Sequence, residues 1–301
     1  MSAFLAGGTS DLSDNGSAGT GYLILGANGQ LGKALQAKYP KAHAVDSDKL
    51  DITDQQALKN FDWSATKTII NAAGYTNVDG AETADGRALA WLVNAAGASN
   101  LARIAIDKNL PLIHISTDYV FDGSQKSHSE NEPLSPLSTY GASKAAGDIA
   151  ISLVPTHFII RTSWLIGEGN NFVRTMMGLA EKDVAPTVVA DQIGRLTFTN
   201  TLVDAISHLL TTNCQYGTYN VSNDGEPASW ADITRAIFKE LGREDLNVTN
   251  TTTAQYYADK PSSAPRPLQS TLDLSKIKVT GFAPTDWRTD LVKYVQKEMA
   301  K

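Results

Sequence analysis

The sequence predicts an α/β protein in which a doubly wound parallel sheet carries a smaller, discontinuous α/β domain. Two observations lead to this class. Short apolar runs alternate with helix-like stretches from residue 21 onward, and this alternation is typical of a parallel sheet with helices on both faces. The runs are also apolar throughout rather than at every second residue, as expected of strands that are buried on both faces.

The first half of the chain follows this alternation closely. We expect strands at residues 22–25, 42–45, 68–70, 112–115 and 158–161. We expect helices at residues 30–38, 54–60, 85–109 and 138–153. Because each connection is long enough to cross back over the sheet, consecutive strands should run parallel.

The alternation becomes less regular after residue 161. Further helices are predicted at residues 171–181, 199–211, 230–241 and 287–299, further strands at 187–190 and 216–221, and a polar, proline-rich stretch at 259–270. We therefore predict a sheet domain over residues 21–166 and 199–222 and a smaller domain over 167–198 and 223–301. Residues 1–20 are rich in Gly and Ser and are predicted to be a flexible linker, either a tag remnant or a cut through a longer protein.

Composition excludes several classes of protein. The chain has 301 residues, of which 42% are hydrophobic and 8% aromatic, enough to form a core. With a net charge of −6, the chain lacks the basic character that nucleic-acid binding requires. The single cysteine, Cys214, excludes an intrachain disulfide and a thiolate metal cluster. With no signal peptide and no apolar run of about 18 residues, we expect a cytoplasmic protein without a membrane partner.

A glycine-rich turn follows the first predicted strand and opens the first helix. Its glycines have the spacing G-x-x-G-x-x-G, which permits a tight turn and lets backbone N–H groups approach a pyrophosphate. The helix N-terminus adds partial positive charge. This strand–turn–helix context predicts a Rossmann-type, dinucleotide-binding first domain, so the second domain would hold the substrate. The predicted cofactor contacts in the turn are Gly26, Asn28, Gly29, Gln30, Leu31 and Gly32.

An acidic residue, Asp46, ends the second predicted strand. A carboxylate there can accept hydrogen bonds from the adenosine ribose and repel a 2′-phosphate, and the only cation close by is Lys49, so NADH is modestly favoured over NADPH. Asp51 and Ile52 are predicted to hold the adenine edge. The alternative for both acids is a solvated surface turn.

The third predicted strand ends in small residues. Asn71, Ala72 and Ala73, with Tyr75 just beyond, leave room for a ligand at the carboxyl edge of the sheet, where open α/β folds bind theirs. We predict cofactor contacts from all four residues. Close packing alone is the other explanation of the alanines.

Tyr140 and Lys144 are spaced i, i+4 on a predicted helix, which places both side chains on one face. An ammonium beside a phenol lowers the pKa of the phenol toward neutrality, and such a phenol can give a proton to a carbonyl oxygen as hydride arrives. Thr117, at the end of the fourth predicted strand, can bond the same substrate oxygen, with Ser116 beside the cofactor. The three residues Tyr140, Lys144 and Thr117 are the predicted catalytic group.

Six segments, taken in order, carry a resemblance to a known family. The segments GANGQLG, NAAGYTNVDGAE, ISTDYVFDG, YGASKAAGD, RTSW and GNNFVRTM resemble the dTDP-4-dehydrorhamnose reductases of the extended short-chain dehydrogenase/reductase family. The resemblance runs from about residue 22 to the C-terminus and is dense through Thr197. It implies reduction of the C4 ketone of dTDP-4-dehydro-L-rhamnose by NADPH or NADH, the last step of dTDP-L-rhamnose synthesis.

The resemblance also implies substrate contacts. Thr117 would assist Tyr140, and Asp118 would lie beside the sugar. Trp164 would pack on the substrate, although it can also be read as a core aromatic at a domain junction. The predicted nucleotide contacts are Asn171, Phe172 and Arg266.

Three departures from the family pattern carry expectations. Some members dimerise through magnesium held by glutamates, and Ala34 occupies one of those positions, so we expect no metal site and a monomer. Leu196 replaces a usual proline, which predicts a differently shaped loop. The segment 1–20 is not part of the usual family start and is compatible with a trimmed fusion behind a 3,5-epimerase.

Two other functions are compatible with parts of this pattern. Nucleotide-sugar dehydratases and epimerases belong to the same extended family. The dehydratases typically have the sequence T-D-E after the strand, whereas in this chain Asp118 is followed by Tyr119, which is not an acid. A non-catalytic regulatory subunit, similar to that of methionine adenosyltransferase, would keep the dinucleotide turn. Such an NADP-binding subunit would bind NADH or NADPH and leave it unoxidised.

Overall fold

The computed structural model describes residues 19–301. Its centre is a six-stranded parallel sheet in the order β10-β5-β4-β3-β1-β2. The strands are β1 (Tyr22–Leu25), β2 (His43–Val45), β3 (Thr68–Asn71), β4 (Leu112–Thr117), β5 (His157–Thr162) and β10 (Gly217–Asn220). The direction of winding reverses between β1 and β3, so the predicted doubly wound sheet is confirmed and its switch point lies at the ends of these two strands. All but the last two residues of the predicted linker lie outside the described residues.

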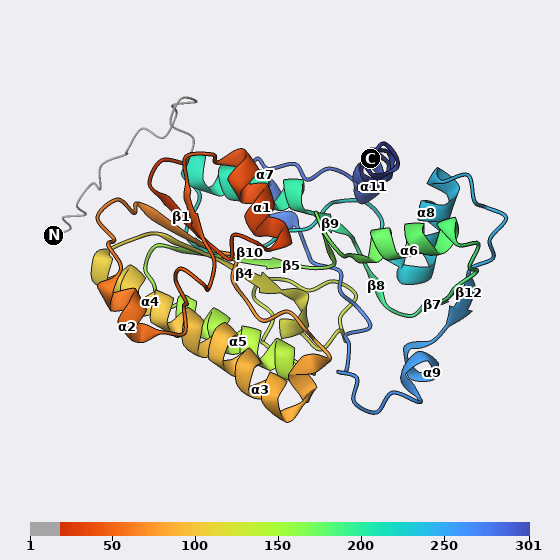
Figure 1. The fold of residues 1–301 in the computed structure, drawn as a ribbon, viewed down its shortest axis with the longest axis horizontal. Coiled ribbons are helices and arrows are strands. Elements are labelled where there is room, and N and C mark those ends of the chain that lie inside the picture. Colours follow the sequence, from red (N-terminus) through yellow and green to blue (C-terminus); the bar gives the residue numbers. More distant parts are fainter. Residues whose placement is uncertain (1–18) are drawn as a thin grey trace.

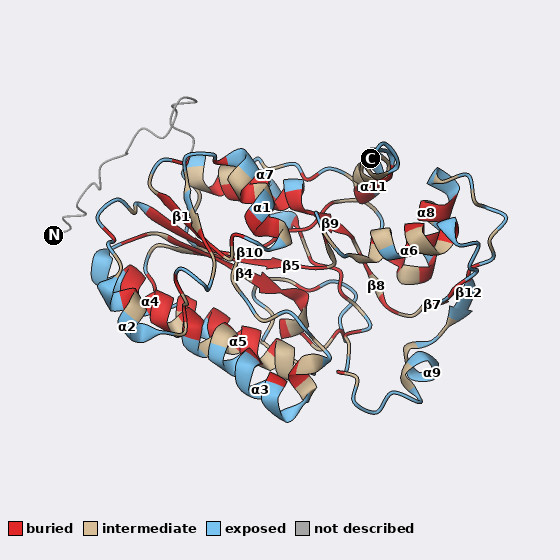
Figure 2. Ribbon diagram, in the orientation of Figure 1, coloured by how far each residue is buried: buried red, intermediate tan, exposed pale blue. Residues whose placement is uncertain are grey.

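Helices cover both faces of the sheet (Figure 1). On one face α1 (Gln30–Lys38) packs against α7 (Thr199–Thr211), and on the other α4 (Ala98–Lys108) packs against α5 (Thr139–Ile151) and the short α2 (Gln55–Asn60). The faces of these helices that turn to the sheet are buried and their outer faces exposed, as Figure 2 shows. Two apolar clusters, one on each side, hold the layers together.

The single helix predicted over residues 85–109 is interrupted. The chain forms α3 (Ala84–Ala90), a π-helical turn η2 (Trp91–Gly97) and then α4. The side chain of Asn94 in the wide turn accepts from the backbone N–H of Tyr75 and donates to its carbonyl and to Ser143 Oγ, which explains the local change of pitch. The whole stretch Ala84–Lys108 is long and apolar enough to cross a membrane by length and composition, and 44% of its most apolar window is buried inside the protein.

A second group of elements has an apolar core of its own, around the buried residues Ile237, Phe238 and Trp287. It comprises α6 (Phe172–Glu181), α8 (Trp230–Glu240) and α11 (Trp287–Met299), with the strand pairs β7 (Thr187–Val189) with β12 (Thr249–Thr251) and β8 (Ile193–Gly194) with β11 (Ala228–Ser229). The remaining short elements are β6 (Leu165–Ile166) paired with β9 (Thr197–Phe198), α9 (Thr253–Tyr257), α10 (Ser275–Val279), η1 (Gly80–Glu82) and η3 (Asp118–Val120). The domain boundaries stay a prediction. Three residues that we assigned to the second domain pack in the core of the sheet: Leu272, Leu274 and Ile277.

Candidate active site

The glycine turn between β1 and α1 is closed tightly. Gly26 has φ +80°, in the left-handed region that favours glycine, and a Cβ there would lie 2.6 Å from the backbone N of Ala73. A Cβ on Gly32 would lie 2.1 Å from the Gly26 carbonyl oxygen. The first turn of α1 has no side-chain cap and no acidic residue, so its N–H groups can bind an anion.

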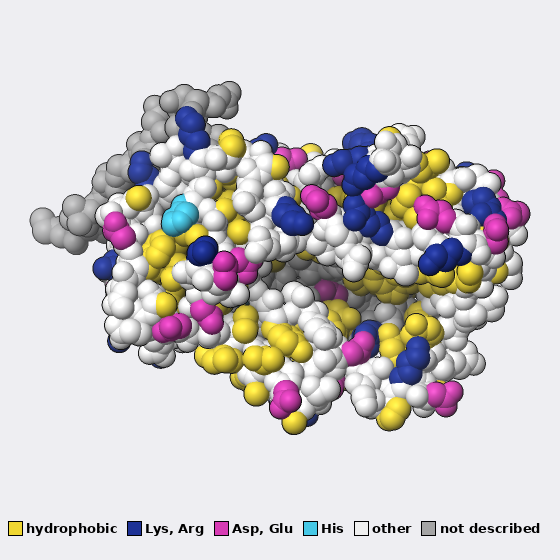
Figure 3. Space-filling model, viewed as in Figure 1, with side chains coloured by type: hydrophobic (Ala, Val, Ile, Leu, Met, Phe, Trp, Pro, Cys, Tyr) yellow, Lys and Arg dark blue, Asp and Glu magenta, His cyan; other side chains and the backbone are white. Residues whose placement is uncertain are grey.

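A cleft of about 1020 Å³ runs along the carboxyl edge of the sheet, beginning at this turn. Figure 3 shows the molecule hollowed between the sheet layers and the part that carries α6 and α8. The cleft brings together most of the residues predicted to contact the cofactor, including two that are also predicted to be catalytic, Tyr140 and Lys144; the others are Gly26, Asn28, Gly29, Gln30, Leu31, Asp46, Asp51, Ile52, Ala72, Ala73, Tyr75 and Ser116. Gly32 and Asn71 do not line it and instead shape the turn and the sheet edge behind it.

The groups in this cleft fit a dinucleotide. The glycines keep the floor of the turn free of side chains, and Gln30 Oε1 and Thr162 Oγ1 are buried polar atoms of the lining that have no hydrogen-bond partner within residues 19–301. Buried polar atoms are normally hydrogen-bonded, so these two point to a polar ligand.

The carboxylate of Asp46 is fixed at the edge of the cleft. Its Oδ2 accepts from the backbone N–H of Asn28 at 2.8 Å, and its Oδ1 from that of Ser47 at 2.8 Å. Each oxygen keeps a further lone pair for a ligand hydroxyl. Asp51 Oδ1 accepts from the N–H and the hydroxyl of Thr53, so this carboxylate is also held in place where it lines the cleft.

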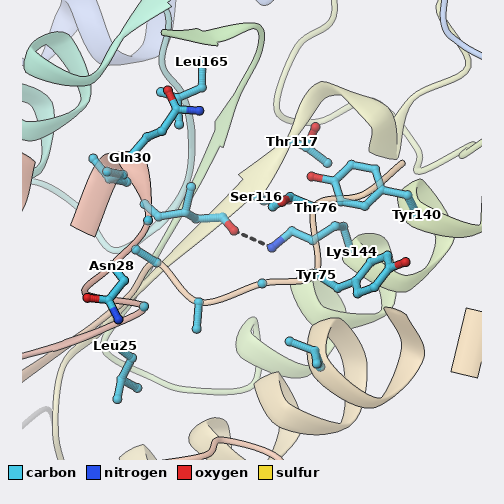
Figure 4. Close-up of a pocket in the computed structure, with 18 of the residues that line it drawn as sticks. Leu25, Asn28, Gln30, Tyr75, Thr76, Ser116, Thr117, Tyr140, Lys144 and Leu165 are labelled. Carbon is cyan, nitrogen blue, oxygen red and sulfur yellow. Dashed lines mark hydrogen bonds between the residues drawn. The ribbon is translucent and has the colours of Figure 1, made fainter. Parts of the chain in front are cut away.

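The predicted catalytic residues meet in the middle of the cleft (Figure 4). Tyr140 and Lys144 belong to the first turns of α5, which Ser138 caps by accepting from the N–H of Gly141 at 3.1 Å. Thr117 is the last residue of β4, and its side chain lies next to that of Tyr140. The Thr117 hydroxyl donates to Asp118 Oδ1 at 3.0 Å.

The pKa of Tyr140 is raised above its ordinary value, which is the opposite of the predicted direction. Burial is the main cause, the negative charge of Asp118 adds to it, and the Thr117 hydroxyl partly offsets it. The prediction that Lys144 brings this pKa toward neutrality is therefore wrong for this structure. Tyr140 is held as a neutral phenol, ready to donate a proton.

The amine of Lys144 is directed at the backbone of β4. Its Nζ donates to the Ile115 carbonyl oxygen at 2.6 Å, the contact dashed in Figure 4, and lies 3.4 Å from His114 Nε2. Burial lowers the pKa of Lys144 to about 8, against an opposing contribution from Asp148. Burial also raises the pKa of the neighbouring Asp118 carboxyl to about 6.

A second cavity of about 470 Å³ continues from the first, since Tyr119 and Trp164 line both. We call it the aromatic cavity after six of its lining residues: Tyr119, Trp164, Phe172, Trp230, Tyr256 and Tyr257. Trp164 has φ +46°, an uncommon conformation for a large residue, and stacks on Trp230 with ring centroids 3.7 Å apart. Arg266 also lines this cavity, pairs with Asp79 at 2.8 Å and lies over the Tyr257 ring.

Asn171 differs from the other predicted nucleotide contacts. It lines neither of these two cavities, because its side chain caps α6 through the N–H of Arg174 and donates to Gly167, Gly169 and Tyr294. The structure instead adds Trp230, Tyr257 and His114, which the sequence analysis did not single out. Trp230 starts a predicted helix, His114 lies inside an apolar strand and Tyr257 is one of two adjacent tyrosines, and none of these patterns distinguishes a site residue from a core residue.

Comparison with known proteins confirms the resemblance. The family described as RmlD substrate binding domain matches residues 21–300. A dTDP-4-dehydrorhamnose reductase of Aggregatibacter actinomycetemcomitans is 39% identical over 89% of this chain and 96% of its own. The spore coat polysaccharide biosynthesis protein SpsK of Bacillus subtilis is 37% identical over 92% of this chain and 98% of its own.

Solved structures agree with the sequence comparisons. The crystal structure of a dTDP-4-dehydrorhamnose reductase from Bacillus anthracis in complex with NADP superposes with a TM-score of 0.83 at 36% identity, covering 93% of this chain and 98% of that one. An orthologous reductase from Clostridium acetobutylicum gives 0.84 at 34% identity, covering 92% and 99%. The Rossmann-type fold, its parallel sheet and the motifs in its cleft therefore place this chain in the RmlD substrate binding domain family.

Proposed function

We propose that this protein reduces the C4 ketone of dTDP-4-dehydro-L-rhamnose to dTDP-L-rhamnose with NADPH or NADH. The observation that carries the proposal is the continuity of two cavities. One holds the glycine turn together with Tyr140, Lys144 and Thr117, and the other is an aromatic cavity suited to a nucleotide base. The relatives at 33–39% identity that are named for this reaction support the same substrate.

Each catalytic side chain in the cleft would carry out a different part of the reduction. A bound nicotinamide would supply the hydride. Tyr140, kept neutral by its burial, would donate its proton to the carbonyl oxygen, and the Thr117 hydroxyl would orient that oxygen. The ammonium form of Lys144 would stabilise the negative charge that then develops on the phenol.

For the substrate, we assign the sugar to the space between Asp118 and Trp164 and the nucleotide to the aromatic cavity beside Phe172 and Arg266. The cofactor would follow the edge from the glycine turn to Ser116, with Asp46 at its adenosine ribose. Asn171 is omitted from this assignment because its side chain caps α6 and donates to Gly167, Gly169 and Tyr294.

The test is a direct assay. The protein is mixed with dTDP-4-dehydro-L-rhamnose and either NADH or NADPH, loss of the reduced nicotinamide absorbance is followed, and the product is identified by mass spectrometry. We expect oxidation of at least one cofactor and one equivalent of dTDP-rhamnose. Binding of cofactor without oxidation would instead favour a regulatory subunit, and an isomerised substrate with no net oxidation would favour an epimerase.

We further propose a cytoplasmic monomer without a structural metal. Ala34 supports this, because its methyl group cannot ligate magnesium at a position where the family resemblance implies a glutamate. Light scattering with and without magnesium tests the proposal, and a magnesium-dependent dimer would contradict it. Association with a 3,5-epimerase remains part of the proposal and is tested by co-purification with that enzyme.

A further inference from the structure

A row of buried polar side chains leads from Lys144 into the sheet, and two of its members, Asn71 and His114, have no part in the chemistry described above. It joins three neighbouring elements through Asn71 at the end of β3, His114 in β4 and Lys144 in α5. Asn71 and His114 are each 1% exposed and Lys144 is 5% exposed, so Asn71 and His114 depend on protein partners for their hydrogen bonds. The positions of their protons therefore follow from the contacts that they make with each other.

The amide of Asn71 fixes the tautomer of His114. Asn71 Oδ1 accepts from the backbone N–H of Ala73 at 3.1 Å, so its Nδ2 is the atom that faces His114 Nδ1, at 3.0 Å. An amide nitrogen can only donate, so Nδ1 must accept. In a neutral imidazole the proton then lies on Nε2.

That proton points at the Lys144 nitrogen, which lies 3.4 Å from Nε2. An ammonium has three N–H groups and no lone pair, so it cannot accept this hydrogen bond, whereas a neutral amine can. With a neutral Lys144, each of these polar groups has a hydrogen-bond partner, because the amine accepts from His114 while still donating to the Ile115 carbonyl oxygen. The contact therefore favours the uncharged lysine.

We propose that His114, with its tautomer fixed by Asn71, is a positioning residue that aims the Lys144 nitrogen and disfavours its ammonium form. The consequence for catalysis rests on the proposed function, in which Lys144 acts as an ammonium. The other charged groups facing Lys144 are Asp148 on its own helix and Arg161 on β5, which pair with each other at 3.0 Å, and Tyr140 and Asp118 line the cleft beside it. Burial also disfavours the charged lysine and lowers the pKa of Lys144, while Asp148 opposes that effect.

The first test needs no activity. Protein labelled with nitrogen-15 histidine is studied by long-range proton–nitrogen NMR without cofactor, and the His114 signals, among those of five histidines, are assigned by their loss in His114→Phe. We expect a neutral ring protonated on Nε2 from pH 6 to 9. An Nδ1-protonated ring or an imidazolium would overturn the proposal.

The second test changes what Lys144 meets. In His114→Gln the side-chain amide can turn its oxygen to the ammonium, so Lys144 should titrate about one pH unit higher, a tenfold gain in proton affinity. Lysine-selective nitrogen NMR follows this titration, with Lys144→Met for assignment. His114→Phe, which offers neither donor nor acceptor, controls for the loss of the ring nitrogens.

The kinetic readout is the pH profile of kcat/KM. The alkaline limb of His114→Gln should move upward together with the Lys144 titration, while near-ultraviolet circular dichroism shows an intact fold. A Gln variant that titrates at the pH of the wild-type protein would reject the role of His114. Correct NMR results without any turnover would instead reject the proposed function and leave the His114–Lys144 arrangement standing.

Discussion

Replacing Lys144 with methionine should make the folded protein more stable at neutral pH while abolishing its turnover. Lys144 is 5% exposed, and its pKa falls from 10.5 to about 8 on burial. A lowering of this size corresponds to a cost of about 3 kcal/mol for keeping the lysine charged in the folded state. The lost hydrogen bond to Ile115 offsets about 1–2 kcal/mol of the gain, so we expect the variant to be more stable by about 1–2 kcal/mol at pH 7.

The sign of the pH dependence follows from the two protonation states. Below about pH 8 the lysine is charged in both the folded and the unfolded chain, so the cost is fully present. Between about pH 8 and 10.5 the folded chain has released the proton and the unfolded chain has not, so the cost fades as pH rises. The stability advantage of Lys144→Met should therefore shrink through this range.

Urea unfolding of the wild-type and variant proteins at pH 7, 8 and 9 measures this difference. Lys108→Met is the matched control, because Lys108 is an exposed lysine near the end of α4 and its replacement should change stability little at any pH. A Lys144→Met variant that is less stable at pH 7, or whose advantage stays constant up to pH 9, would show that Lys144 carries no such burial cost. The reasoning about its ionisation would then fail.

Three further changes test other parts of the site. Tyr140→Phe should lower turnover by a factor on the order of 10² or more, the usual effect of losing a general acid, with an unchanged circular dichroism spectrum; near-normal turnover would remove Tyr140 from the mechanism. Asp46→Ala should lower the affinity for NADH more than the affinity for NADPH in fluorescence titrations, and equal losses of affinity would show that Asp46 does not contact the ribose. Gly32→Ala places a methyl group 2.1 Å from the Gly26 carbonyl oxygen, so it should strongly lower the affinity for both cofactors. Unchanged affinities would mean that the turn can open without cost.

The fold agrees with the sequence prediction more closely than the contacts of Tyr140 and Lys144 do. Spacing alone places Tyr140 and Lys144 on one helix face, and they do share one cleft. The same spacing suggests that the lysine acts on the phenol, yet its nitrogen contacts Ile115 and His114. The partners of a buried charge come from neighbouring strands, and periodicity along one helix carries no information about them.

Local sequence alone determined much of this protein. Helices α1, α7 and α11 begin and end at the predicted residues, and the glycine turn lies between β1 and α1 as predicted, because apolar periodicity and glycine geometry act over a few neighbouring residues. Only the tertiary structure decided the π turn at Asn94, the aromatic cavity around Trp230 and the proton positions beneath Lys144. Each of these depends on burial and on hydrogen bonds between residues far apart in the chain, which set the energy of a polar group only once the layers have packed.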